Sequence, residues 1–543
     1  MTATTSAKPE VFTRKASGLV RVMSPYSAFA YNILTMGLIF PWTYLWGPGA
    51  FPGGSLVWGI IIATVLEIPI ALAYVWLSTA LPRSGGDYVF QSRVFGGGIG
   101  FSIVMSGFVI WILQWVALSG WLLAYLGFMP LFLGLGATLA SPGLTAAGFW
   151  FTTPTGIIVT SIGNALVSLI LLVSGFKNYV KFQHVMWYAT LIAFVVMLFV
   201  LFSADPQTFA ERINAFVVAT GGSDGFYQTA INAAKAKNID LAPAFDWKMT
   251  LLIAPIAWTS LQWASYSVQQ NGEIKNARSF KSQATIIMGS LVVTGALLAI
   301  LAAAFEHAIG TDFLNIAGQG YMAALPEGTI NGVYLWPSIV AIAISASPIL
   351  VVLISLGYIL NSFQIVNNCY IGMTRVMVAM SLDRLLPEWV SRVSPNLHTP
   401  VAAHVAYFLA SIPVILLYNL WGQWYSLTLG VTFACGYVFV VTSLAGALLP
   451  YRAKALYEAS PGAQYKLGGL PMITVVGLLG AVVGGIMVLM FIFSDKFGLN
   501  TDLAHYVVIG VLVVAVVWYF AAKAYQSSRG IDVSFAFKEI PPE

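Results

Sequence analysis

Residues 31–41 read YNILTMGLIFP, an apolar stretch interrupted by Gly37 and Pro41. Because proline has no backbone N–H to donate and glycine loosens the preceding turn, the sequence predicts that a helix breaks here. The surrounding segment, residues 24–46, is long enough to cross a bilayer, which takes about 20 apolar residues. A break at membrane depth exposes backbone groups, which is tolerated only beside a cavity. The stretch therefore predicts a membrane-spanning helix that is interrupted at a buried site.

The rest of the chain has the composition of a membrane protein. Of its 543 residues, 59% are hydrophobic and 8% are charged, whereas soluble domains carry about 25% charged residues. The pattern predicts an all-α integral membrane protein with about twelve spanning helices. They are expected at residues 24–46, 55–80, 98–128, 153–175, 180–203, 249–271, 284–307, 336–368, 401–418, 422–449, 471–494 and 503–526.

Lysine and arginine positions predict the orientation of these helices. If the N-terminus is cytoplasmic, 20 of the 25 basic residues fall in the tails and the inner loops, as the positive-inside rule requires. The five exceptions are Arg212, Lys235, Lys237, Lys248 and Lys496. We therefore expect a multi-pass protein of the cell membrane with both termini in the cytoplasm. Its partner is the lipid bilayer and not nucleic acid, since the net charge of +5 reflects a basic inner face.

A second interruption falls in the sixth span. Pro255 precedes a polar cluster, and residues 258–263 read WTSLQW. Spans one and six are five helices apart, and a five-helix unit that repeats must insert upside down, so the sequence predicts inverted repeats with the breaks in equivalent positions. The alternative is that Gly and Pro are simply common in membrane helices. The expected divisions are residues 1–23 (cytoplasmic tail), 24–203 (first repeat), 204–248 (extracellular loop), 249–449 (second repeat), 450–526 (last two helices) and 527–543 (cytoplasmic tail).

The paired interruptions predict the residues that bind a small-molecule substrate. The expected set comes from both breaks, with one aromatic residue from the third span that helix packing could also explain. Its members are Asn32, Gly37, Trp258, Thr259, Ser260, Gln262 and Trp111.

Polar residues at membrane depth predict a site for a coupling ion, either H⁺ or Na⁺. Glu67 is the one acidic residue deep in a predicted span, where a charge is costly; it is either a cation site or a structural carboxyl bonded to a neighbouring helix. Ser355, Asn361 and Ser362 in the eighth span are further candidates, and the amides of that span could instead join helices. No metal-ligand spacing, nucleotide fingerprint or catalytic triad occurs, so we expect no other cofactor, no metal and no enzymatic activity.

Three loops on the predicted inner side resemble a known family. Residues 81–90 (LPRSGGDYVF), 374–387 (TRVMVAMSLDRLLP) and 272–276 (GEIKN) are similar to signature loops of the amino acid–polyamine–organocation permeases. The resemblance covers helices 1 to 10 in order. It implies the five-plus-five inverted-repeat fold of leucine-transporter-like proteins, with helices 1 and 6 discontinuous and the substrate held at their breaks. The chain departs from the pattern at Trp263, where relatives often have glycine, and at Thr190, where some relatives have a coupling lysine.

Charged residues in these loops predict a gate at the cytoplasmic mouth. Asp87 can cap the short helix that follows Gly85 and Gly86. Arg375 and Arg384 can form and break ion pairs with Asp383 and Glu388.

Together these features predict a secondary transporter for amino acids or related small organic molecules, working by alternating access and coupled to a cation. The alternatives are a carrier of polyamines, organocations or nucleobase-like compounds, and a nutrient sensor built on a transporter fold. A channel would require a continuous polar pore, and few polar residues recur on every helix. Nothing in the sequence indicates an oligomeric state.

Overall fold

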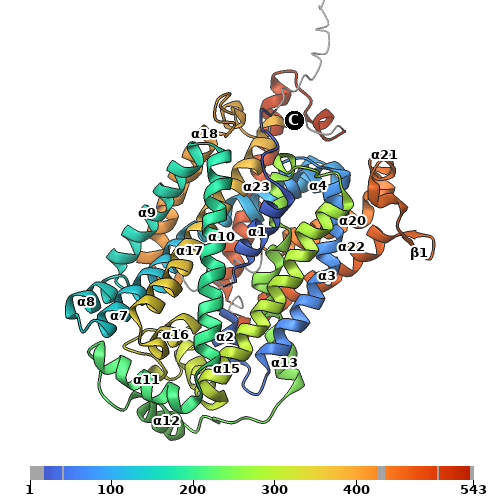
Figure 1. The fold of residues 1–543 in the computed structure, drawn as a ribbon. Helices are drawn as coiled ribbons and strands as arrows, with labels where there is room; N and C mark the ends of the chain where they lie inside the picture. Colours follow the sequence, from blue (N-terminus) through green and yellow to red (C-terminus); the bar gives the residue numbers. More distant parts are fainter. Residues whose placement is uncertain (1–16, 39–41, 425–426, 428–434, 498–500, 539–543) are drawn as a thin grey trace, which may run out of the picture.

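The computed structural model of the protein describes residues 17–38, 42–424, 427, 435–497 and 501–538. Long helices run between two ends of a bundle (Figure 1). One end carries α4 (Gly86–Phe95) and the C-terminal segment, and we refer to it as the α4 end. The opposite end carries α12 (Phe226–Ala236) and is called the α12 end.

The first ten helices and their π-helical turns occupy residues 25–202. They are α1 (Pro25–Met36), α2 (Trp42–Ala50), α3 (Leu56–Ala80), α4, α5 (Gly97–Val104), the π-helical η1 (Met105–Ile110), α6 (Ile112–Leu122), the π-helical η2 (Leu123–Phe128), α7 (Met129–Thr138), α8 (Pro142–Trp150), α9 (Pro154–Val173) and α10 (Phe176–Phe202).

The remaining elements include one two-stranded hairpin. They are α11 (Pro206–Ala219), α12, α13 (Trp247–Leu261), the 3₁₀-helical η3 (Gln262–Glu273), α14 (Phe280–Ala284), the π-helical η4 (Thr285–Gly289), α15 (Ser290–Tyr321), η5 (Pro326–Gly328), α16 (Pro337–Ser345), α17 (Pro348–Leu382), η6 (Glu388–Ser391), α18 (Val401–Leu420), α20 (Tyr437–Arg452), α21 (Lys454–Glu458), η7 (Pro461–Gln464), the antiparallel β1 (Lys466–Leu467) and β2 (Leu470–Pro471), α22 (Met472–Phe493), η8 (Asp495–Phe497), α23 (Asp502–Ser528) and η9 (Val533–Lys538).

The all-α membrane class predicted from the sequence is confirmed. Among the described residues, nine helical runs are long and apolar enough to cross a membrane. Their outward faces carry bare apolar side chains, such as Phe199 at 70% exposure and Ile349 at 71%. Polar side chains such as Gln183 and Gln269 are fully buried. This inversion of a soluble protein's pattern is what lipid as the solvent requires.

The eighth predicted span, residues 336–368, is two helices and not one. Ala346 adopts a left-handed conformation with φ of 42°, and Pro348 then starts α17 as its first residue. Since proline has no donor to give to a preceding turn, α16 cannot continue through it. α17 runs on to Leu382, well past the predicted end.

The segment between the predicted spans 284–307 and 336–368 is partly helical. Gly310, at φ of 76° and ψ of 155°, breaks α15 into two helical parts, and the second part ends at Tyr321. Glycine adopts this positive φ at little cost, so the chain can turn between the two parts. The predicted extracellular loop at 204–248 contains two helices, α11 and α12. At the α12 end of the bundle, both pack against α15, and α11 also packs against α16. Part of the predicted span 422–449 lies outside the described residues.

The first span is interrupted where the glycine predicts it. α1 ends at Met36, and Gly37 turns the chain with φ of 78° while its N–H donates to the carbonyl of Ile33. A new helix, α2, starts at Trp42. Pro41, the other residue used to predict this break, lies outside the described residues.

The sixth span changes its helical type instead of stopping. α13 ends at Leu261, and the chain continues as the 3₁₀-helical η3 to Glu273, with a kink at Gln270, whose φ of −112° and ψ of 29° are not helical. A 3₁₀ segment this long is uncommon, because its hydrogen bonds are poorly aligned. η3 packs against α1, so the two irregular segments lie next to each other.

Candidate functional site

A small cavity lies between the two irregular segments. The space open to the centre of a water molecule is about 30 Å³, enough for about two waters. Four elements line it: α1, α6, η3 and α17. The lining residues are Thr35, Ile112, Trp115, Trp263, Tyr266, Ile365, Asn368 and Cys369. None of these eight is charged, and most of the wall is aromatic or aliphatic.

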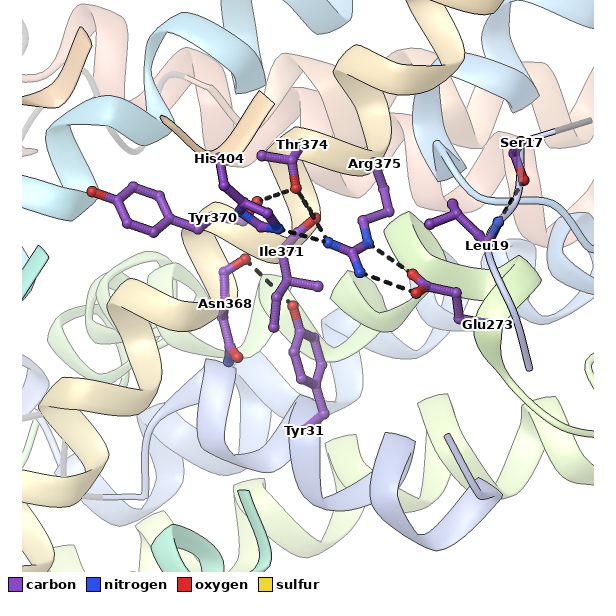
Figure 2. Close-up of polar contacts among 10 residues, drawn as sticks. All are labelled: Ser17, Leu19, Tyr31, Glu273, Asn368, Tyr370, Ile371, Thr374, Arg375 and His404. Carbon is purple, nitrogen blue, oxygen red and sulfur yellow. Dashed lines mark hydrogen bonds and ion pairs between the residues drawn. The ribbon is translucent and has the colours of Figure 1, made fainter. Parts of the chain in front are cut away.

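Asn368 organises the polar side of the cavity. Its amide nitrogen donates to Thr35 Oγ1 at 2.7 Å, and its amide oxygen accepts from Tyr179 at 3.1 Å and from Gln364 at 2.5 Å. Its backbone carbonyl accepts from the hydroxyl of Tyr31 at 3.4 Å (Figure 2). The residue therefore connects α17 to both α1 and α10.

The predicted substrate residue Asn32 holds the break together. Its side-chain oxygen accepts from the backbone N–H of Ser267 in η3 at 2.9 Å, and its amide donates to the carbonyl of Ile286 in the π-helical η4 at 3.3 Å. Because irregular helices leave backbone groups without intrahelical partners, one asparagine satisfies two of them across three elements.

None of the seven predicted substrate residues lines the cavity. Thr259 and Gln262 bond to carbonyls of their own helix, at Ile256 and Thr259, although Gln262 Oε1 has no partner among the described residues. The others are one glycine and three buried side chains. Gly37 forms the turn, while Trp258, Ser260 and Trp111 are buried at 8% exposure or less.

The lining residues fall about one helical turn later in the sequence than the predicted ones. Thr35 follows Asn32 by three residues on α1, and Trp115 follows Trp111 by four at the third span. On η3, Trp263 and Tyr266 come four residues after Thr259 and Gln262. The predicted residues therefore lie within about one helical turn of the residues that line the cavity, but on a turn that does not face it. The signal in the sequence that could have indicated the lining turn was the presence of aromatic residues among the polar ones.

Glu67 in α3 contacts the sixth span directly. Its side chain is fully buried, and Oε2 accepts from Trp258 Nε1 at 2.6 Å. Oε1 has no hydrogen-bond partner among the described residues. The one acidic residue that the sequence places deep in a span is therefore attached to α13, one turn before η3 begins.

The other predicted ion-site residues lie along α17. Asn361 donates to the carbonyl of Leu34 at 3.4 Å, which satisfies one of the last carbonyls of α1 at the break. Ser355 and Ser362 are buried, and Ser355 Oγ has no partner among the described residues. The described part of the chain holds no group of three or more His, Cys, Asp or Glu that could bind a metal ion.

At the α4 end, Arg375 forms a fully buried ion pair with Glu273 (Figure 2). Its Nε and Nη2 donate to the two carboxylate oxygens at 2.7 and 3.0 Å, a bidentate geometry. The guanidinium also lies 4.8 Å from the ring centre of Phe176, and Nη1 lies 3.2 Å from Nε2 of the buried His404. The pair joins the end of η3 to α17.

A second buried ion pair involves Asp383. Arg93 in α4 donates to its two oxygens at 2.7 and 3.1 Å, and the hydroxyl of Tyr88 donates to Oδ2 at 2.7 Å. The sequence selected Asp383 and Arg375 correctly as ion-pair residues but not the partners Arg93 and Glu273 described here. Arg384, the remaining predicted arginine, has φ of 63°, and its carbonyl accepts from Gln526.

Asp87 is buried and contacts three neighbouring helices. Its carboxylate accepts from Tyr74 in α3, from Thr442 in α20 and from Gln269 in η3, the last two at 2.5 Å. Burial raises the pKa of the Asp87 carboxyl above its ordinary value, although these three donors act to lower it. The capping role predicted for Asp87 is wrong, because the N-cap of α4 is Gly85 and no side chain caps the helix. Asp87 instead joins α4 to η3.

A polytopic bundle with a cavity between two irregular spans is the arrangement that secondary transporters use for substrate binding. A family model for amino acid permeases matches residues 26–517. The chain therefore belongs to the amino acid permease family, and it is a transporter and not an enzyme.

Named relatives are similar over much of the chain. It is 24% identical to the branched-chain amino acid permease BcaP of Bacillus subtilis over 421 residues, which is 74% of this chain and 76% of that protein. It is 27% identical to BcaP of Lactococcus lactis over 353 residues, 54% of this chain and 69% of that protein. An uncharacterised protein of Sulfolobus islandicus rod-shaped virus 1 is 34% identical over 83 residues, so the chain spans only 21% of its length.

The contribution of the buried ion pair between Arg375 and Glu273 to the stability of the α4 end can be tested by substitution. Glu273→Gln leaves the guanidinium buried without a counter-charge, and we expect a loss of about 3–5 kcal/mol in stability. Thermal unfolding of the purified protein in detergent measures it. Glu458→Gln is the control, because its pair with Lys454 is exposed and should contribute little. Equal melting temperatures for the two variants would contradict the assignment.

Proposed function

We propose that this permease is a secondary carrier of apolar amino acids that binds its substrate in the cavity between α1, α6, η3 and α17. The observation that carries the proposal is the lining itself. Ile112, Trp115, Trp263 and Ile365 offer an apolar wall beside a few polar groups, which is the usual make-up of a small-molecule site. The names of the two bacterial relatives, branched-chain amino acid permeases, favour the same class of substrate.

The lining argues against the alternative of a polyamine or other multiply charged cation. A buried cation requires a paired negative charge. None of the eight lining residues is acidic. Glu67, the carboxyl predicted as a cation site, bonds to Trp258 and does not line the cavity.

The proposal of alternating access rests on contacts that close the two ends of the site. The α4 end is held by the buried ion pairs of Arg375 with Glu273 and of Arg93 with Asp383. Towards the α12 end, aromatic rings meet instead: between ring centres, Trp42 stacks on Trp121 at 6.2 Å and meets Trp336 edge-on at 6.1 Å. In our proposal, a carrier opens one closure at a time, and a cavity of about 30 Å³ expands when substrate enters.

Uptake into proteoliposomes tests the proposed function. We expect accumulation of labelled leucine, isoleucine or valine when a pH or sodium gradient is imposed, and no competition by excess putrescine or adenine. Uptake of putrescine or adenine in place of the amino acids would overturn the substrate class. Binding of amino acids without any transport would favour a sensor.

Proton coupling through Glu67 is the second part of the proposal. Its carboxylate is attached to Trp258, and a change in its protonation would alter that hydrogen bond next to η3. Glu67→Gln should keep exchange of substrate across the membrane but lose accumulation driven by a pH gradient. Glu306→Gln, which removes another carboxyl from a spanning helix, is the control.

Two results would contradict this role of Glu67. One is full pH-driven accumulation by Glu67→Gln. The other is wild-type uptake that follows sodium and ignores pH, which would transfer the role to Ser355, Asn361 and Ser362 on α17.

We propose that the α4 end and both termini face the cytoplasm, because the sequence assigns 20 of the 25 basic residues to the tails and the inner loops. Asn396 and Ser223 are exposed at the two ends of the bundle. Cysteines introduced at these positions should react with an impermeant maleimide from opposite sides, Ser223→Cys in intact cells and Asn396→Cys only after lysis. Labelling of both in intact cells would refute the orientation.

A further inference from the structure

Two hydrogen-bonding groups of the cavity wall have no partner. Trp263 Nε1 and the hydroxyl of Tyr266 bond to nothing among the described residues, although the side chains are only 6% and 3% exposed. Both residues line the same cavity and both come from η3. Buried polar groups are almost always satisfied, so two such groups beside one empty space indicate a ligand or ordered water.

The surrounding rings fix these two groups in place. Tyr266 stacks on Tyr31 with ring centres 6.2 Å apart and planes 2° from parallel, and it meets Trp263 edge-on at 5.5 Å. Trp263 is further enclosed by Phe108 and Phe439, at 5.9 and 5.6 Å. Rings held on several sides cannot rotate to find other partners, so the N–H and O–H remain directed by packing.

Gly372 in α17 makes room for the tyrosine hydroxyl. A Cβ at this position would collide with the hydroxyl oxygen of Tyr266. α17 can therefore pack closely against the end of the Tyr266 side chain only because residue 372 is glycine. The position of the hydroxyl is part of how η3 and α17 fit together.

The two groups without a hydrogen-bond partner determine which kind of ligand atom can bind them. An indole N–H can only donate, and a phenol O–H donates to a strong acceptor. The amide of Asn368 and the hydroxyl of Thr35 are already bonded to each other, and Thr35 donates onward to the carbonyl of Tyr31. The indole nitrogen and the phenol oxygen without a partner are therefore both donors, which suit a carboxylate oxygen.

We propose that Trp263 Nε1 and Tyr266 OH bind the carboxylate of the transported amino acid, and that waters occupy this place between transport cycles. This inference rests on the proposed function, because it assumes an amino acid in the cavity. It adds which end of the substrate meets η3: the carboxylate lies against Trp263 and Tyr266, and the apolar side chain lies against Ile112 and Ile365. Trp263 and Tyr266 then determine the preference for acids.

The test compares leucine with leucinamide, which keeps the amino group and side chain but replaces the carboxylate with a neutral amide. Both are measured as competitors of labelled leucine uptake in proteoliposomes. The wild type should prefer leucine by at least about tenfold. Tyr266→Phe should raise the leucine KM about tenfold to a hundredfold, since it removes a bond to a charged group, and leave leucinamide nearly unchanged.

Tyr407→Phe is the matched control, because this buried tyrosine does not line the cavity and its hydroxyl donates to the carbonyl of Val109 at 3.1 Å. It should keep the wild-type ratio between leucine and leucinamide. If Tyr266→Phe does not fold, Trp263→Phe carries the same expectation, and size-exclusion chromatography establishes folding for each variant.

The outcomes separate the inference from the proposed function. If the wild type transports leucine and both η3 variants fold but keep its preference for leucine over leucinamide, the carboxylate binds elsewhere and only this inference fails. If the wild type transports no apolar amino acid, the proposed function fails and this inference fails with it.

Discussion

The structure depends on one constraint: a backbone group inside a membrane must find a hydrogen-bond partner within the protein. α1 stops at Met36 and the sixth span changes to a 3₁₀ helix after Leu261, so both leave groups that their own helices cannot satisfy. Asn32 and Asn361 supply partners, at Ser267, Ile286 and Leu34. These two asparagines, and not the helices themselves, hold the broken segments at the edge of the cavity.

The two ends of the site are closed by different physics. At the α4 end, α17 joins η3 and α4 through two buried ion pairs, which are specific in geometry and costly to break singly. Towards the α12 end, Trp42, Trp121 and Trp336 contact through their rings, which can slide past one another without leaving a charge bare. In the proposed carrier, the ion pairs close the α4 end through specific partners. The tryptophan rings close the other end through apolar contacts that can deform.

Hydropathy predicted the membrane class and the approximate position of the spans, because lipid requires long apolar helices. It failed at residues 336–368, where Pro348 starts a new helix, and after Gly310, where a second helical part of α15 reaches Tyr321 in a segment outside the predicted spans. For the cavity, the predicted residues lie within about one helical turn of the lining residues but on a turn that does not face inward, since that depends on how neighbouring helices rotate. The sequence could not predict the ion-pair partners either, because residues far apart in the chain meet only through helix packing. Glu273 and Arg375 are 102 residues apart, and Arg93 and Asp383 are 290 residues apart.

The central claim is that the cavity between the interrupted spans binds the transported molecule, and Cys369 provides the most direct measurement. Its thiol belongs to the cavity wall, and the chain's other cysteine, Cys435, can be replaced by serine. The rate of Cys369 alkylation by N-ethylmaleimide is measured in this variant with and without saturating leucine. The account predicts that leucine slows the reaction severalfold while leucinamide has a much weaker effect. An alkylation rate that saturating leucine leaves unchanged, in protein that transports leucine, would contradict it.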